Sequence, residues 1–155
     1  MLQPTIRPIA PADLAAWRPL WDGYNAFYGR SGDTTLPEHI TESTWRRFLD
    51  PAEPVHALVA QRQGQVVGLA HYLFHRSMTR IENVCYLSDL YTLPELRGQG
   101  LGRALIEGVC AEAHRAGVVR VYWQTHESNA AGRRLYDQVA KHHGFIVYAR
   151  DALPG

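Results

Sequence analysis

The stretch Arg97-Gly98-Gln99-Gly100-Leu101-Gly102 decides the fold, because it joins a predicted strand to a predicted helix. Its glycines let the backbone approach a ligand closely and turn several N–H groups in the same direction. The helix that follows adds free N–H donors and a positive dipole end, worth about 0.3–1 kcal/mol per anionic charge. The loop therefore predicts an anion site that is best suited to phosphate or pyrophosphate.

Three other interpretations of this loop compete with a simple anion site. A nucleotide-hydrolysing P-loop needs Lys and Ser or Thr after its last glycine, but Arg103 and Ala104 follow Gly102. A dinucleotide fingerprint needs a later third glycine and an acid about 20 residues on, whereas the next predicted strand runs into Gln124. A tight turn without a ligand would not need three glycines flanked by arginines. The anion site is therefore the favoured interpretation.

The rest of the chain alternates strand and helix patterns around this loop. Apolar residues at three- and four-residue steps predict helices, and runs of β-branched and aromatic residues predict strands. The expected strands are 5–9, 56–62, 65–74, 83–93, 118–124 and 145–148, and the expected helices are 11–28, 37–49, 101–116 and one that begins at Asn129. The strand–helix–strand unit in the second half implies a parallel strand pair. We therefore expect a single α/β (α+β) domain over residues 1–155.

Two motifs in this order resemble the signatures of the GCN5-related N-acetyltransferases. Arg97-x-x-Gly100-x-Gly102 resembles the family's acyl-CoA signature, and Leu90-Tyr91-Thr92-Leu93-Pro94 resembles the strand end that precedes it. Asn129-x-x-Gly132-x-x-Leu135-Tyr136 resembles the second signature, in which alanine usually stands at the position of Gly132. The family's closing Gly-Phe is delayed here to Gly144-Phe145. The aromatic first helix resembles the subgroup of yeast histone and polyamine acetyltransferases.

The resemblance implies a mixed, mostly antiparallel sheet flanked by helices, with a splayed parallel strand pair that holds acetyl-CoA. By this analogy the backbone of Gly98, Gln99, Gly100, Leu101 and Gly102 binds the pyrophosphate, while Arg97 and Arg103 add charge. The main chain of Leu90, Tyr91, Thr92 and Leu93 pairs with the pantetheine arm, and backbone N–H groups at Leu90 and Tyr91 hold the oxyanion. Asn129 lies near the pantetheine, with a simple helix N-cap as its alternative role. Arg133 reaches the adenosine phosphates.

Tyr136 matches the family's tyrosine that protonates the departing thiolate of CoA, and it also counts among the cofactor-binding residues. A CoA-like thiol has an ordinary pKa near 8.5 and tyrosine one near 10, so full proton transfer runs uphill by roughly 2 kcal/mol. A hydrogen bond that strengthens as charge builds on sulfur still stabilises the transition state. An ordinary buried tyrosine is the competing interpretation.

The acceptor amine must lose a proton before it can attack, because an alkyl ammonium in water has a pKa near 10.4. Asp89, just before the loop, is the preferred carboxylate, and Glu82 and Glu127 are further candidates. By strand alternation Asp89 and Tyr91 share one face. Tyr24 and Tyr28 are candidates for an aromatic slot that accepts the amine, with Asp89 and Glu127 beside it. The competing interpretation of the aromatic helix is hydrophobic core.

The prediction is an acetyl-CoA-dependent N-acetyltransferase that acts on a small primary amine or amino acid by direct attack. A protein acetyltransferase and a non-catalytic acyl-CoA-binding module are the alternatives. The charges nearly cancel, with 16 Lys and Arg against 15 Asp and Glu, which argues against a nucleic-acid partner. No H-E-x-x-H pattern or cysteine pair suggests a metal. We expect no membrane partner, a cytoplasmic location and a homodimer.

Overall fold

The computed structural model describes residues 3–153 and divides the chain into two compact units, residues 1–124 and residues 125–155. Within residues 3–124, the first unit contains a five-stranded sheet and the helices that cover it. Within residues 125–153, the second unit contains α4 (Ala130–Val139).

The sheet has the strand order β1-β2-β3-β4-β5, with antiparallel pairing between the first four strands and a parallel β4–β5 pair. A parallel neighbour requires a crossover, which α3 supplies between β4 and β5. These features confirm the expected mixed, mostly antiparallel α/β fold. The strands are β1 (Thr5–Pro8), β2 (Val55–Arg62), β3 (Gln65–His75), β4 (Val84–Thr92) and β5 (Val121–Tyr122).

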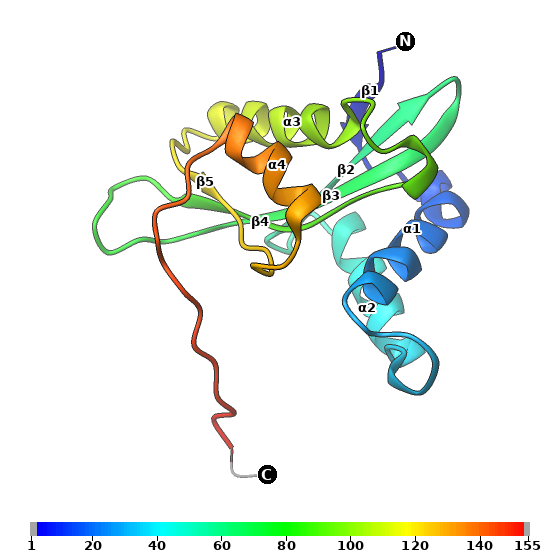
Figure 1. Cartoon of the computed structure of the whole chain (residues 1–155), viewed down its shortest axis with the longest axis horizontal. Helices are drawn as coiled ribbons and strands as arrows, with labels where there is room; N and C mark the ends of the chain where they lie inside the picture. Colours follow the sequence, from blue (N-terminus) through cyan, green and yellow to red (C-terminus); the bar gives the residue numbers. More distant parts are fainter. Residues whose placement is uncertain (1–2, 154–155) are drawn as a thin grey trace. The chain divides into compact units, whose positions relative to one another are not determined.

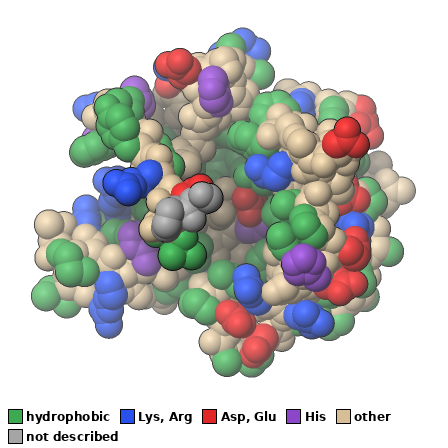
Figure 2. Space-filling model, turned by 90° about the horizontal axis from the view of Figure 1, so that it is seen from below, with side chains coloured by type: hydrophobic (Ala, Val, Ile, Leu, Met, Phe, Trp, Pro, Cys, Tyr) green, Lys and Arg blue, Asp and Glu red, His purple; other side chains and the backbone are tan. Residues whose placement is uncertain are grey.

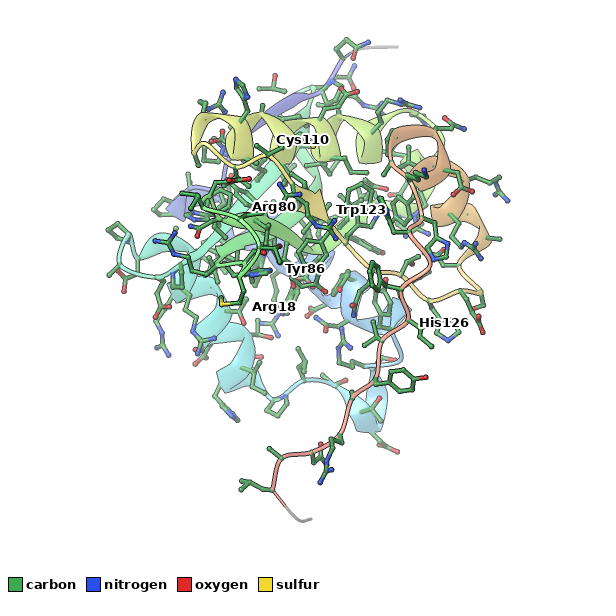
Figure 3. The ribbon with its side chains drawn as sticks, turned by 90° about the vertical axis from the view of Figure 1, so that its left-hand side faces the viewer. Arg18, Arg80, Tyr86, Cys110, Trp123 and His126 are labelled. Atoms are coloured by element: carbon green, nitrogen blue, oxygen red, sulfur yellow. The ribbon has the colours of Figure 1, made fainter. Side chains whose placement is uncertain are left out.

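Helices cover both faces of the sheet (Figure 1). The helix α3 (Leu101–Arg115) lies along one face, and α1 (Leu14–Phe27) and α2 (Glu38–Leu49) lie on the other. Figure 3 shows the same division, with Cys110 of α3 and Tyr86 of β4 on opposite sides of the sheet. The two faces therefore have different neighbours, and the α1/α2 face carries the aromatic residues discussed below.

The core between α1, α2 and the sheet is aromatic. Trp17 is fully buried, and its ring lies 5.1 Å from Trp45 and 5.7 Å from Trp21, both centroid to centroid. Leu20 and Leu69 complete this cluster. The aromatic side chains of α1 thus belong mainly to the hydrophobic core, which was one of the two interpretations of this helix from the sequence.

Asp13 precedes α1 but does not cap it with its side chain. Its carboxylate instead accepts two hydrogen bonds from the guanidinium of Arg7, at 2.8 and 2.9 Å, and one from the backbone N–H of Ala10 at 2.7 Å. The hydrogen bonds from Arg7 lower the pKa of Asp13 below its ordinary value, against the opposing effect of burial. This ion pair ties β1 to the start of α1.

One predicted strand, 118–124, was too long, and another, 145–148, was wrong. The predicted strand 118–124 is reduced to Val121–Tyr122, and Val119 is 76% exposed. Residues 145–148 form no strand, and their four apolar side chains are exposed. β-branched and aromatic residues favour a strand only where a neighbouring strand accepts their backbone hydrogen bonds. Their sequence alone therefore overstated the regular structure here.

Candidate active site

A split beside β4 leaves part of its backbone without a strand partner. The strands β4 and β5 pair only at Cys85↔Val121 and Tyr86↔Tyr122, and the N–H of Cys85 donates to the carbonyl of Arg120 at 2.8 Å. Within residues 3–124, no strand pairs with Leu87–Thr92 on this side. The end of β4 therefore offers main-chain donors and acceptors to an extended ligand.

A bulge at Ser88 decides which groups face this split. His71 of β3 pairs with Asp89, but the next residue, Tyr72, pairs with Leu87, so Ser88 is the extra residue. A bulge shifts the pairing of the strand by one residue and so changes which backbone groups beyond it point toward β3 and which point away. The N–H of Leu93 donates to the carbonyl of Val67 on β3 at 3.0 Å.

Backbone groups alternate sides along a strand, and this places the N–H of Tyr91 toward β3, like that of Leu93. The N–H groups of Leu90 and Thr92 then face the split. Of the two oxyanion donors expected from the sequence, the geometry therefore favours Leu90.

The glycine loop ends in the N-terminus of α3. Gly98 and Gly100 adopt φ values of +79° and +84°, in the left-handed region that glycine enters without strain. Gly100 is the N-cap residue, and its carbonyl accepts from the N–H of Ala104 at 3.0 Å. The N–H groups of the first α3 turn precede this first intrahelical bond, so they are directed out of the helix end. Such outward N–H groups at a helix N-terminus are the donors on which the predicted anion site depends.

The side chains of the loop hold it against the rest of the first unit. Arg97 lies over the rings of Tyr91 and Phe27, with its guanidinium carbon 5.3 and 5.9 Å from the ring centroids. The amide oxygen of Gln99 accepts a hydrogen bond from Arg62 at 2.7 Å. Arg103 is half-buried in the first turn of α3. Arg97 and Gln99 therefore fix the loop even before any ligand is bound.

A buried chain of hydrogen bonds connects α1, β3 and β4. The indole N–H of Trp17 donates to Nε2 of His71 at 3.1 Å, and Nδ1 of His71 lies 2.9 Å from Oδ2 of Asp89. An indole N–H can only donate, so Nε2 accepts and the ring proton is on Nδ1, where it donates to Asp89. His71 is thereby fixed in one neutral tautomer.

Asp89 is an ionised carboxylate on the α1/α2 face of the sheet. Burial raises its pKa, but the hydrogen bond from His71, with smaller contributions from Tyr24 and Ser88, outweighs burial. The pKa of Asp89 therefore lies below its ordinary value. Its side chain is 17% exposed, so the carboxylate is still partly accessible to solvent.

The two tyrosines predicted for an aromatic slot lie close to Asp89 but differ in exposure. Tyr24 is buried, stacks on Trp21 with centroids 5.6 Å apart, and donates to the carbonyl of Ser88 at 3.4 Å. Burial and the nearby Asp89 raise the pKa of Tyr24. Tyr28 lies 5.0 Å from Tyr24 and is 40% exposed. Tyr24 is thus a neutral core residue and Tyr28 a surface ring.

A pocket of about 270 Å³ opens at Asp89 between β2, β3, β4 and the helices α1 and α2. Sequence reasoning found Asp89 but missed His71 and Arg47. Alternation along β3 could have placed His71 on the face of Leu69, but no sequence signal pairs it with Asp89. The residues that matter most for the chemistry of the pocket are Trp21, Arg47, Phe48, His71, Leu73 and Asp89.

Further candidate residues lie in the second unit. Asn129 is the N-cap of α4: its amide oxygen accepts from the N–H of Gly132 at 3.2 Å, and its nitrogen donates to Thr125 at 2.9 Å. The N-cap interpretation of Asn129 is thereby confirmed. Arg133 donates to the backbone carbonyl of Glu127 at 3.0 Å. Tyr136 is half-buried on α4.

Blue and red side chains are interspersed on the face in Figure 2, without one large basic field. Cys85 and Cys110 are free thiols, and burial raises the pKa of Cys85 to about 12. Across residues 3–153 no cluster of three or more metal-ligating side chains is found. Nor does the same range contain a helix with the length and apolar character of a membrane span.

A mixed sheet whose parallel pair splays beside a glycine-rich helix N-terminus defines the class of acyl-CoA-dependent transferases. Residues 17–145 match the family model described as acetyltransferase (GNAT) family. The chain belongs to this family and is an acetyl-CoA-dependent N-acyltransferase.

Curated relatives extend over most of the chain. The chain is 34% identical over 148 residues to the D-amino-acid N-acetyltransferase HPA3 of Saccharomyces cerevisiae, covering 94% of this chain and 89% of the relative. It is 36% identical over 117 residues to aminoglycoside N(6')-acetyltransferase type 1 of Stenotrophomonas maltophilia, covering 74% and 70% of the two chains. The first relative also agrees with the yeast-like subgroup suggested by the sequence.

Solved structures share the fold at low sequence identity. The structure of AAC(6')-Iy in complex with the bisubstrate analog CoA-S-monomethyl-acetylneamine superposes with a TM-score of 0.83. The match has 17% identity and covers 98% of this chain and all of that one. At this identity the likeness establishes the fold alone.

Proposed function

We propose that the protein transfers the acetyl group of acetyl-CoA to the primary amine of a small amino acid. The observation that carries this proposal is an ionised Asp89 in a small pocket beside the unpaired end of β4. A carboxylate there attracts an ammonium group to the strand along which we propose that the thioester lies.

The first unit supplies the proposed acetyl-CoA site. The outward N–H groups of the α3 N-terminus and of the loop 97–102 are suited to the pyrophosphate, because they are donors at a positive helix end. The pantetheine arm would lie along β4, opposite the N–H groups of Leu90 and Thr92. In the reaction the N–H of Leu90 would stabilise the oxyanion that forms at the thioester carbon.

The proposed reaction is direct attack. The neutral amine forms the new C–N bond to the thioester carbon, the carbonyl oxygen becomes an oxyanion, and the C–S bond then breaks as the carbonyl re-forms. The departing sulfur takes a proton from Tyr136, and the nitrogen gives up one proton. The products are the N-acetyl compound and free CoA.

The depressed pKa of Asp89 limits its part in proton transfer. An ordinary carboxyl pKa of 3.8 lies more than six pKa units below that of an alkyl ammonium, so direct transfer costs about 9 kcal/mol. We therefore propose that the bound ammonium loses its first proton to solvent. Asp89 then orients the amine and accepts the second proton after C–N bond formation has made the nitrogen acidic.

The size of the pocket favours a small acceptor. Its volume of about 270 Å³ lies just below the roughly 300–1,000 Å³ that is usual for ligand pockets. The HPA3 relative, by its name, acts on D-amino acids, and the aminoglycoside relative on a larger amine. D-amino acids are therefore the first acceptors to test. A cytoplasmic location and a homodimer remain predictions.

The test is thiol release from acetyl-CoA with a panel of acceptors: D- and L-amino acids, polyamines, an aminoglycoside and histone peptides. We expect amine-dependent release that is fastest with amino acids. Acetyl-CoA binding without amine-dependent thiol release would instead support the non-catalytic binding module. Faster turnover of the peptides than of any small amine would support a protein acetyltransferase.

A further inference from the structure

The pocket at Asp89 has charged side chains of both signs. Asp89 comes from β4, and Arg47 comes from the last turn of α2, yet both line the same cavity of about 270 Å³. A site that needed only to attract an amine would require the carboxylate alone. A cation beside it is unfavourable for a plain amine, because like charges repel.

Arg47 makes no ion pair and its side chain donates no hydrogen bond within residues 3–153. Three other arginines of the first unit are engaged: Arg7 and Arg18 pair with acids, and Arg30 donates to the side chain of Asn25 at 2.6 Å. The planar guanidinium of Arg47 is thus available, and its donors match the two oxygens of a carboxylate.

Apart from Thr44, His71 and Ser88, the remaining walls of the pocket are aliphatic or aromatic. Trp21, Phe48 and Leu73 lie among its lining residues. A ligand that satisfies all parts of this lining carries an ammonium group, a carboxylate and an apolar side chain. This is the chemistry of an apolar α-amino acid.

We propose that Arg47 binds the α-carboxylate of the acceptor and thereby makes the enzyme selective for zwitterionic amino acids over plain amines. This inference rests on the proposed function and adds the residue that determines its specificity. Asp89 holds the ammonium end, Arg47 the carboxylate end, and the apolar wall the side chain. An arginine that was merely solvated at the helix end would make no such distinction between acceptors.

Arg46 provides the matched control. It is adjacent, exposed and in the same last turn of α2, and it is absent from the pocket lining. Both residues lie in the last turn of α2, where a cation is stabilised by the negative end of the helix dipole. Any effect of Arg47→Gln that Arg46→Gln lacks is therefore an effect of the pocket.

The experiment compares each amino acid with its carboxamide, which keeps the shape and the amine but removes the negative charge. D- and L-leucine and phenylalanine and their amides serve as substrates in the thiol-release assay. For the wild type and Arg46→Gln we expect kcat/KM to favour the acid over the amide by roughly 10- to 100-fold, the range of a charge-assisted hydrogen bond. In Arg47→Gln this ratio falls toward one, mainly through KM, and Arg47→Lys restores part of it.

A second readout separates the inference from the proposed function. Calorimetric binding of the same acids and amides to the protein with CoA needs no turnover, and we expect the same loss of acid selectivity in Arg47→Gln. If the wild type binds acids selectively but releases no thiol, the proposed function fails and the role of Arg47 stands. If acid and amide are equivalent in the wild type, or Arg47→Gln keeps the preference, the role of Arg47 is refuted.

Discussion

Replacing Asp89 with asparagine tests the centre of the proposed site while sparing its structure. The amide has the shape of the carboxylate, and its oxygen can still accept the hydrogen bond that Nδ1 of His71 now gives at 2.9 Å. The chain Trp17–His71–Asp89 therefore keeps its geometry, and only the negative charge is lost. The change isolates the electrostatic attraction of the ammonium group.

The expected magnitude follows from the position of Asp89. Two unit charges about 4 Å apart attract by about 4 kcal/mol at an effective dielectric constant of 20, and desolvation of both groups reduces this. A hydrogen bond to a charged group contributes about 1.5–3 kcal/mol. Asp89→Asn should therefore lower kcat/KM for the amine by roughly 10- to 150-fold. The KM of acetyl-CoA should not change, because the loop 97–102 is untouched.

The pKa of Asp89 gives this prediction a pH signature. Its pKa is below its ordinary value, so Asp89 is ionised throughout the range from pH 6 to pH 9. The ratio of wild-type to variant kcat/KM should stay constant over this range, while both rates rise with pH as more amine becomes neutral. A ratio that changed around pH 7 would indicate that another group supplies the charge.

The assay is thiol release with a fixed amino acid, and thermal unfolding reports whether the variant folds. Asp33→Asn is the control, since Asp33 is an exposed carboxylate in the short helix Gly32–Thr34. We expect the control to match the wild type. An Asp89→Asn variant that folds normally and turns over the amine at the wild-type rate would refute the proposed role of Asp89.

Three further predictions concern the acid, the loop and the fold. Tyr136→Phe should lower kcat by about 10- to 100-fold without loss of CoA binding. A single-turnover rate of acetyl transfer equal to that of the wild type would exclude Tyr136 as the proton donor. Gly100→Ala should lower the free energy of unfolding by about 1–2 kcal/mol, because φ is +84°, and should raise the KM of acetyl-CoA; Gly102→Ala, whose φ is not positive, is the control for denaturant unfolding. Asp13→Asn should destabilise the protein at pH 7 by about 1–3 kcal/mol. Because the folded pKa of Asp13 is depressed, this stabilisation is present above its unfolded value near 3.8 and is lost as the pH falls through the folded pKa. In urea unfolding, the difference between wild type and variant should therefore shrink as the pH is lowered below 3.8.

The parts of the site that are local in sequence could be predicted. The glycines of the loop 97–102 and the helix after them are adjacent, and their backbone requirements are read directly from residue type. Asp89 could also be named, because strand alternation places it on one face of β4, and it lines the pocket, whereas Tyr24 lies in the core. The connection between the expected strands 56–62 and 65–74 is also local, and its residues Gln63 and Gly64 adopt positive φ values of 52° and 77°.

The parts of the site that depend on distant segments of the chain could not be predicted from the sequence. Trp17 and His71 are separated by 54 residues, and only the packing of α1 on β3 brings the indole to the imidazole. Arg47 faces the pocket because α2 lies over the sheet, and nothing in its neighbourhood distinguishes it from Arg46. The Ser88 bulge depends on how β3 and β4 pair, which neither strand specifies alone.

By itself, then, the sequence determined the element order, the phosphate-type loop and the family, because these depend on residue type and short spacing. Tertiary structure alone decided the neutral tautomer of His71, the lowered pKa of Asp89, and the presence of Asp89 and Arg47 in the lining of one pocket. It also decided that residues 145–148 form no strand in the described chain. The physical reason is common to all four. Hydrogen bonds, desolvation and strand pairing are properties of two or more groups, so they are fixed only when the fold brings those groups together.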